Sequence, residues 1–124
     1  MRKITKVLSG AVAAVGALTA LAVTAPAAQA AGTYQGCPYG AVCVYPQNTD
    51  WNNGHPSQIL WSYGVHKLSN QYGQHMVFNN QYGGAKAKLC KGWDGSNCVW
   101  YYDMYTANNY DLGPINTIVI SPTW

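Results

Sequence analysis

The sequence predicts a small all-β domain, a sandwich or barrel of about six to eight short strands. Val, Ile, Tyr and Trp, which favour strands, occur in short runs. Gly, Asn and Pro separate these runs about every ten residues, as turns between strands require. No window has the apolar spacing of an amphipathic helix. The expected strands are Ala41–Tyr45, Gln58–Ser62, His75–Asn79, Ala85–Cys90, Cys98–Met104 and Asn116–Ile120.

Two of these strands have patterns that also predict their environment. In Ala85–Cys90 the lysines Lys86 and Lys88 alternate with Ala and Leu, which is the period of a strand with one buried and one solvated face. Asn116–Ile120 is the most apolar strand, and we therefore expect it in the middle of a sheet. Asn52-Asn53-Gly54 has, in contrast, the composition of a turn.

A short repeat flanks the third strand. Asn70-Gln71-Tyr72-Gly73 recurs ten residues later as Asn80-Gln81-Tyr82-Gly83. Both copies have turn residues and could reverse the chain at an end of the strand between them. Two similar turns in one meander are the favoured interpretation, and a repeated ligand-binding element is the alternative.

Residues 1–30 are predicted to be a secretory signal peptide. The segment begins with three basic residues, Arg2, Lys3 and Lys6. An apolar stretch from Val7 to Val23 follows, and Ala28-Gln29-Ala30 has the small-x-small pattern of a signal-peptidase site. A retained membrane anchor is the alternative, but the stretch is short for a stable span and ends in a cleavage site. We therefore expect a mature, extracellular, single domain of residues 31–124.

The expected mature domain has a formal net charge of zero, because the signal segment carries three of the seven basic residues. It contains neither Arg nor Glu. Its charges are Lys67, Lys86, Lys88 and Lys91 against Asp50, Asp94, Asp103 and Asp111. Nucleic-acid binding and electrostatic membrane binding both require clustered basic side chains. The composition therefore argues against nucleic acid and membrane as partners.

The four cysteines, Cys37, Cys43, Cys90 and Cys98, all belong to the mature domain. An even number of cysteines in a small secreted chain predicts two disulfides. Four cysteines allow three pairings, and the spacing favours the local pairs, because each would close a turn between or beside strands. A zinc site is the alternative, but the spacings are not those of a C-x-x-C knuckle, and an exported protein meets an oxidising environment.

Residues 37–45 have the pattern C-P-x-G-x-x-C-x-Y, a few residues after the predicted cleavage site. This pattern resembles the opening of small secreted actinobacterial proteins in the peptidase inhibitor family that includes the Streptomyces metalloproteinase inhibitor. The resemblance implies a βγ-crystallin-like Greek-key sandwich with local disulfides. Tyr45, Trp51 and Gly54 look like a stretched form of the aromatic-x-Gly corner of crystallin motifs. The calcium signature of crystallin motifs is not recognisable.

In the type inhibitor of this family the reactive bond lies at the first cysteine of the second bridged loop. By position, the resemblance implies an inhibitory loop at Cys90, Lys91 and Trp93. The loop Lys91–Asn97 is longer here than in the type inhibitor and is rich in Gly. A rigid inhibitor presents a loop whose ordering entropy is already lost, and Trp is a frequent anchor in interfaces. A core aromatic folded back over the sheet is the alternative for Trp93.

Catalysis is not expected, and neither is a cofactor. The few Asp residues stand in turn-like settings, and neither a G-x-S-x-G elbow, an H-E-x-x-H motif nor a phosphate loop is present. No thiol is left as a nucleophile if both disulfides form. The histidines have no carboxylates at metal-ligand spacing, and we expect them to be ordinary surface or turn residues. They are His55, His66 and His75.

Two binding functions remain for an expected monomer. The first is inhibition of an extracellular peptidase, which the resemblance implies. The second is a non-catalytic role at the cell surface, as a binder of cell-wall glycan or as a structural protein. Trp51-Asn52-Asn53 and Trp100-Tyr101-Tyr102 combine aromatic faces with amides, and such groups can stack on sugar rings and bond their hydroxyls. An inhibitor needs Lys91 and Trp93, whereas a glycan binder needs several exposed aromatics and is indifferent to Lys91.

Overall fold

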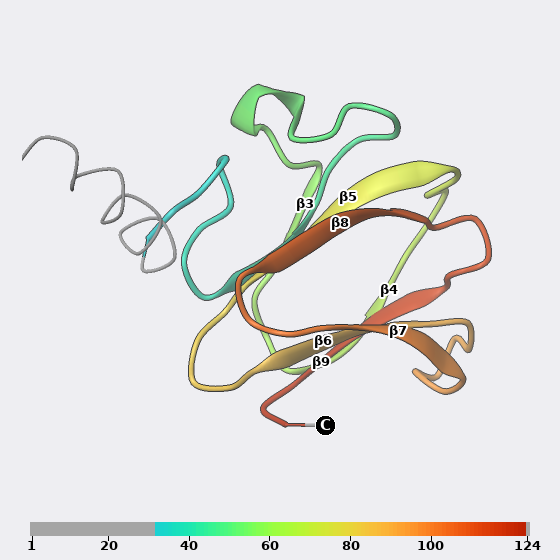
Figure 1. The fold of residues 1–124 in the computed structure, drawn as a ribbon. Helices are drawn as coiled ribbons and strands as arrows, with labels where there is room; N and C mark the ends of the chain where they lie inside the picture. The colour runs from blue at the N-terminus through green and yellow to red at the C-terminus, as the bar shows by residue number, and fades with distance from the viewer. Residues whose placement is uncertain (1–31, 124) are drawn as a thin grey trace, which may run out of the picture. The chain divides into compact units, whose positions relative to one another are not determined.

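The computed structural model describes residues 32–123, and the predicted signal peptide lies outside this range. In the described residues, eight strands form two antiparallel four-stranded sheets that face each other (Figure 1). The first sheet has the strand order β3-β2-β5-β8 and the second has the order β4-β9-β6-β7. Among the described residues, no helix is both long enough and apolar enough to span a membrane.

The strands have these bounds: β2 Ala41–Val44, β3 Gln58–Leu60, β4 Gly64–Lys67, β5 Gln74–Asn80, β6 Lys86–Cys90, β7 Cys98–Tyr102, β8 Thr106–Asp111 and β9 Thr117–Ser121. A short 3₁₀ turn, η2 (Asn52–Gly54), lies between β2 and β3, where a turn was predicted.

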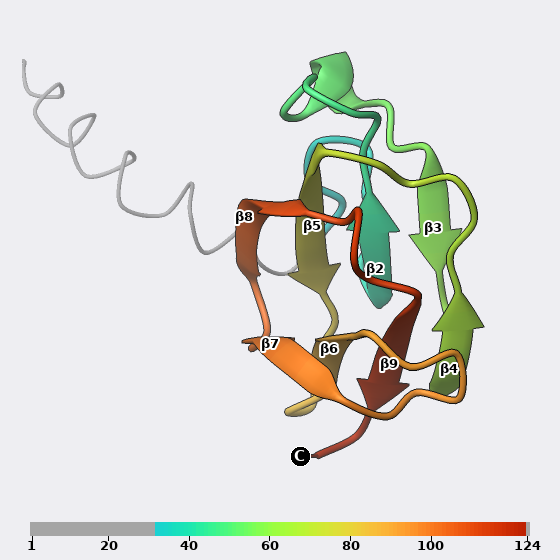
Figure 2. The same cartoon turned by 90° about the vertical axis from the view of Figure 1, so that its right-hand side faces the viewer.

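The first half of the chain (β2–β5) contributes β2, β3 and β5 to the first sheet and β4 to the second. The second half (β6–β9) contributes β6, β7 and β9 to the second sheet and β8 to the first. β4 pairs with β9 of the second half, and β8 pairs with β5 of the first half. Figure 2 shows both exchanged strands at the edges of their sheets. This exchange is the Greek-key arrangement of a βγ-crystallin-like sandwich, and it confirms the predicted fold class.

All six predicted strands are present, with ends that differ from the prediction by at most two residues. The prediction missed β4 and β8, which are the two exchanged edge strands. β8 has the sequence Thr-Ala-Asn-Asn-Tyr-Asp, in which polar turn formers predominate. Its extended shape comes from pairing along β5, so tertiary context overrides its local propensity.

The main core lies between the two sheets. β9 is an inner strand, as predicted, and its Ile118 and Ile120 are buried there. In β6 the side chains of Ala87 and Leu89 are buried, whereas Lys86 and Lys88 are half-buried, so the predicted alternation is confirmed. The buried residues of this core are Val42, Val44, Leu68, Val77, Ala87, Leu89, Tyr102, Leu112, Ile115, Ile118 and Ile120.

A second apolar cluster covers the outer face of the first sheet. Here the Trp51 ring meets the Tyr45 and Phe78 rings edge to face, with centroids 5.3 and 5.5 Å apart. The Tyr45 hydroxyl donates to the Gln35 carbonyl at 2.8 Å, and burial raises the pKa of Tyr45 to about 12. Trp51, one of the aromatics considered for glycan binding, therefore has a packing role.

Both predicted disulfides are present: Cys37–Cys43 in the outer cluster and Cys90–Cys98 between β6 and β7. All four cysteines are bridged, so none is left as a zinc ligand or a nucleophile. Two disulfides fit an oxidising, extracellular environment.

Candidate functional site

The loop Lys91–Asn97, the predicted inhibitory loop, folds back over the outer face of the second sheet. The Gly95 backbone lies so close to β4 and β9 that an added Cβ would be 2.8 Å from Val65 Cγ2 and 3.0 Å from Val119 Cγ2. Within the loop, the Lys91 N–H donates to the Asn97 carbonyl at 3.0 Å. Ser96 donates its hydroxyl and its backbone N–H to Asp94, which lowers the pKa of that carboxyl.

The Cys90–Lys91 peptide bond is built into the sheet. Cys90 is fully buried. Its carbonyl accepts the Asn116 N–H at 3.0 Å, and the Lys91 carbonyl accepts the Asn116 side-chain amide at 2.7 Å. The side chains of Lys91 and Trp93 are exposed, and Trp93 is not a core aromatic. The loop therefore offers these two side chains to a partner, while the backbone at Cys90 is engaged within the protein.

Five exposed aromatic side chains gather at one end of the sandwich, around Gly40. A Cβ at Gly40 would lie 3.3 Å from the Tyr82 ring and 3.7 Å from the Trp61 ring. Tyr39 packs on Tyr82 with ring centroids 4.8 Å apart and also contacts Tyr105. Tyr63 completes the lining beside Trp61 and Tyr82. We call these residues the Gly40 surface: Tyr39, Trp61, Tyr63, Tyr82 and Tyr105.

The links between strands bring these residues together. Tyr39 precedes β2, Trp61 and Tyr63 lie between β3 and β4, Tyr82 follows β5, and Tyr105 lies between β7 and β8. Because neighbouring strands run antiparallel, these positions all fall at the same end of the sandwich.

The Gly40 surface borders a cavity of about 230 Å³ whose lining contains no charged side chain. Trp61, Tyr63 and Tyr82 are each more than half exposed. Gln81, which also lines the cavity, is buried and donates its side-chain amide to Asn79 Oδ1 at 2.9 Å. The arrangement exposes broad aromatic faces beside an uncharged cavity lining.

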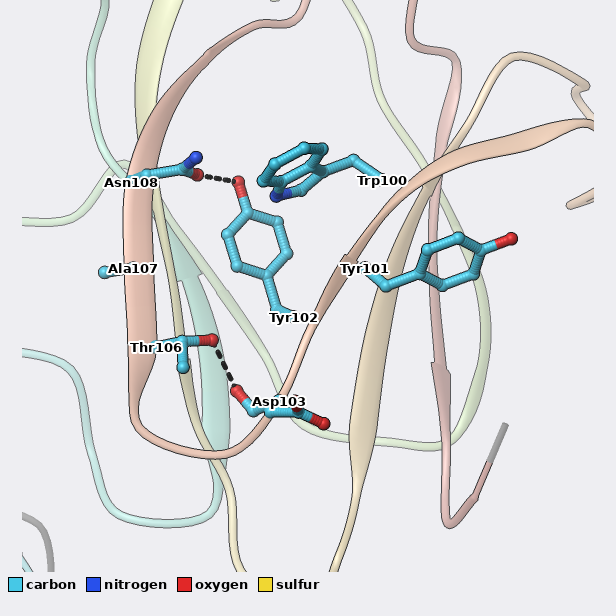
Figure 3. Close-up of a pocket in the computed structure, with 7 residues that line it drawn as sticks. All are labelled: Trp100, Tyr101, Tyr102, Asp103, Thr106, Ala107 and Asn108. Carbon is cyan, nitrogen blue, oxygen red and sulfur yellow. Dashed lines mark hydrogen bonds between the residues drawn. The ribbon is translucent and has the colours of Figure 1, made fainter.

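A second groove, of about 200 Å³, lies between β7 and β8, the edge strands of different sheets (Figure 3). Figure 3 shows Trp100 and Tyr102 pointing toward β8, whereas Tyr101 points away. The Tyr102 hydroxyl donates to Asn108 Oδ1 at 2.6 Å, and burial raises the Tyr102 pKa. Trp100 rests against Tyr110 and keeps one exposed face. Of the three aromatic residues in its lining, Tyr102 is buried and Tyr101 points away from β8, so the groove exposes mainly the Trp100 ring.

The three histidines bond to backbone carbonyls and do not converge. His75 was expected at the surface or in a turn, but it is buried at the start of β5. Its Nδ1 lies 2.6 Å from the Tyr45 carbonyl and its Nε2 lies 2.9 Å from the Tyr72 carbonyl. His66 and His55 contact the carbonyls of Ser62 and Asn52. Within residues 32–123 no cluster of three His, Cys, Asp or Glu side chains could hold a metal ion.

Sequence reasoning missed most of the Gly40 surface. The repeat pointed to Tyr82, and Trp61-Ser62-Tyr63 has the i, i+2 spacing that puts both rings on one side of an extended segment. Nothing in the sequence links either of them to Tyr39 or Tyr105, because those contacts form only when both sheets assemble.

Comparison of the chain with models of protein families, with curated protein sequences and with solved structures gives no match.

Proposed function

We propose that this protein is a secreted, non-catalytic carbohydrate-binding protein that holds a neutral cell-wall glycan on the Gly40 surface. The observation that carries the proposal is the gathering of five exposed aromatic side chains at one end of the sandwich, three of which line an uncharged cavity. A pyranose ring has an apolar C–H face that stacks on Trp and Tyr, while its hydroxyls stay available to water and polar groups. We also propose that residues 1–30 are cleaved during export.

Folding alone does not account for this surface. Burying one large apolar side chain stabilises a protein by about 1.5–3 kcal/mol. Trp61, Tyr63 and Tyr82 each remain more than half exposed and contribute little of that. A contiguous exposed apolar patch on a small soluble domain is typical of a binding site.

The charges of the domain favour a neutral ligand. Two charged residues stand close in sequence to this surface: Lys86 follows Ala85, and Asp103 is two residues before Tyr105. They form an ion pair with each other. The described residues contain four lysines and four aspartates in total. A polyanion would find no basic cluster to bind, so a neutral polysaccharide is the better-matched partner.

Retention on insoluble polysaccharides tests this proposal. The oxidised protein of residues 31–124 would be mixed with cellulose, chitin and curdlan, which are neutral, and the bound fraction measured. We expect retention on at least one of them, with Tyr63→Ala lowering the affinity at least about fivefold, the order of one lost stacking contact of ~1 kcal/mol. Tyr101→Ala is the matched control, because Tyr101 is similarly exposed but belongs to β7 and is not part of the Gly40 surface. Retention on none of the three, or equal loss in both variants, would contradict the proposal.

Peptidase inhibition is the second candidate, favoured by the exposed Lys91 and Trp93 on a loop that the Cys90–Cys98 disulfide closes. A preordered loop loses little entropy on binding. A panel of thermolysin-like metalloproteases and subtilisin-like serine proteases tests it, with reduced protein as a control. Stoichiometric inhibition that Lys91→Ala or Trp93→Ala abolishes and Tyr63→Ala leaves intact would establish this function. Absence of inhibition at micromolar protein would exclude it for those classes.

A further inference from the structure

We propose that the molecule has a second saccharide site, formed by Tyr72 and Trp93 at the other end of β5, so that one molecule can bridge two glycan chains. This inference rests on the proposed function, because it assigns the same class of ligand to a second place on the domain.

The second site is a groove of about 170 Å³ where three loops meet. Tyr72 comes from the β4–β5 loop and Trp93 from the β6–β7 loop, and the β8–β9 loop contributes Gly113, Ile115 and Asn116 to the lining. Tyr72 is 63% exposed and Trp93 is 53% exposed, values close to those of Trp61 and Tyr82 in the Gly40 surface. Two large rings on one groove again offer apolar faces to a ligand.

The amide residues Gln71 and Asn116 also line this groove. Gln71 donates to the Ser69 carbonyl at 2.9 Å, and Asn116 donates to the Lys91 carbonyl at 2.7 Å. These bonds hold the two amides in place. An amide has two donor hydrogens and an oxygen with two lone pairs, so each keeps bonding capacity beyond the single bond it makes here. Such groups can both donate to and accept from sugar hydroxyls.

The repeat Asn-Gln-Tyr-Gly places one tyrosine at each site. Tyr72 and Tyr82 hold the same position in the two copies, and the glycines after them, Gly73 and Gly83, have similar positive φ angles of 74° and 70°. The asparagines that begin the two copies have different environments. Asn80 is buried and donates to the Cys37 carbonyl, whereas Asn70 lies at the surface. The feature that the two copies share is therefore an exposed tyrosine followed by a glycine with positive φ.

The two sites are separated by the length of β5. Its seven residues span about 20 Å at roughly 3.3 Å per residue. The sites therefore lie at opposite ends of the sandwich and can be occupied by different chains. The groove lining contains no charged side chain, as at the Gly40 surface, so the same neutral polysaccharide fits both.

Cross-linking of a soluble polymer tests the inference. The oxidised protein would be titrated with hydroxyethyl cellulose, glycol chitin and laminarin while light scattering is followed, and with cellohexaose, chitohexaose and laminarihexaose in a calorimeter. For the glycan that binds, we expect about two hexasaccharides per protein and a rise in scattering with the polymer. Tyr72→Ala and Trp93→Ala should each lower the stoichiometry to about one and abolish the rise, while binding at the Gly40 surface continues.

The outcomes separate this inference from the proposed function. A stoichiometry of one that Tyr72→Ala and Trp93→Ala leave unchanged, and that Tyr63→Ala weakens, overturns the second site but keeps the first. No binding of any hexasaccharide or polymer overturns both. Loss of peptidase inhibition in Trp93→Ala, with the glycan stoichiometry unchanged, assigns the groove to a protein partner and also overturns the inference.

Discussion

The ring of Tyr39 lies parallel to that of Tyr105, 66 residues further along the chain, with centroids 6.4 Å apart and planes within 7°. Their hydroxyls are hydrogen-bonded at 3.2 Å, and this bond raises the pKa of Tyr105. The contact joins the segment before β2 to the β7–β8 link, and so connects the two halves of the chain at the Gly40 surface.

Tyr105→Phe and Tyr105→Ala separate the hydroxyl of this pair from its aromatic face. If stacking carries glycan binding, Phe should keep the affinity within about twofold, and Ala should lower it severalfold. Both variants should lose less than ~1 kcal/mol of stability, because the bond lies at the surface. Affinity electrophoresis in a polysaccharide gel measures the first effect and urea unfolding the second. Equal weakening by Phe and Ala would mean that the hydroxyls, not the rings, contact the ligand.

Alkaline pH should destabilise the fold through its buried tyrosines. The pKa of Tyr45 is raised from 10.0 to about 12, because burial disfavours the phenolate. The unfolded state therefore releases this proton first, and stability present below pH 10 is lost as the pH rises from 10 toward 12. Urea unfolding between pH 7 and pH 11.5 checks this expectation.

Tyr45→Phe is the variant that tests the cause. It loses the hydrogen bond to the Gln35 carbonyl, which should cost about 1 kcal/mol at neutral pH. Its stability should also fall less steeply above pH 10, because one buried ionisable group is gone. An unchanged slope would show that another group, such as Tyr102, whose pKa is also raised, dominates alkaline unfolding.

Gly95→Ala tests whether the Lys91–Asn97 loop folds over the second sheet. Gly95 has a φ of +87°, and an added Cβ would lie 2.8 Å from Val65 and 3.0 Å from Val119. We expect a loss of about 2–4 kcal/mol from strain and overpacking together, measured by urea unfolding. Gly83→Ala is the control, because its φ is +70° but no atom lies within 4 Å of the added Cβ. Equal losses in the two variants would mean that the loop stands away from the sheet.

Removal of the Cys90–Cys98 bridge should release the same loop. The double variant Cys90→Ala and Cys98→Ala should lose about 2–3 kcal/mol, the magnitude expected for a short closed loop. Trp93 should become more mobile, which NMR relaxation of its indole N–H would report, and bridging of glycan chains should decrease. Binding of polysaccharide at the Gly40 surface should persist, because none of the loops that form this surface contains the disulfide. Unfolding of the whole domain would show that the bridge is required for the fold and not only for the loop.

The sequence by itself determined the elements whose signal is local. Six strands follow from their β-branched and aromatic runs, the pairing Cys90–Cys98 follows from short spacing, and the alternation of Lys86 and Lys88 follows from the pleat of a half-buried strand. The fold class could be predicted for the same reason, because regular short strands with turns between them leave few compact arrangements.

Only the tertiary structure decided the exchanged strands and the candidate sites. β4 and β8 have little strand signal of their own and become strands by pairing with β9 and β5. Tyr39, Tyr82 and Tyr105 look like any other tyrosines along the chain, and they form one surface because antiparallel strands return to the same end of the sandwich. A binding surface made of side chains far apart in sequence depends on every strand register between them, and no local pattern contains that information.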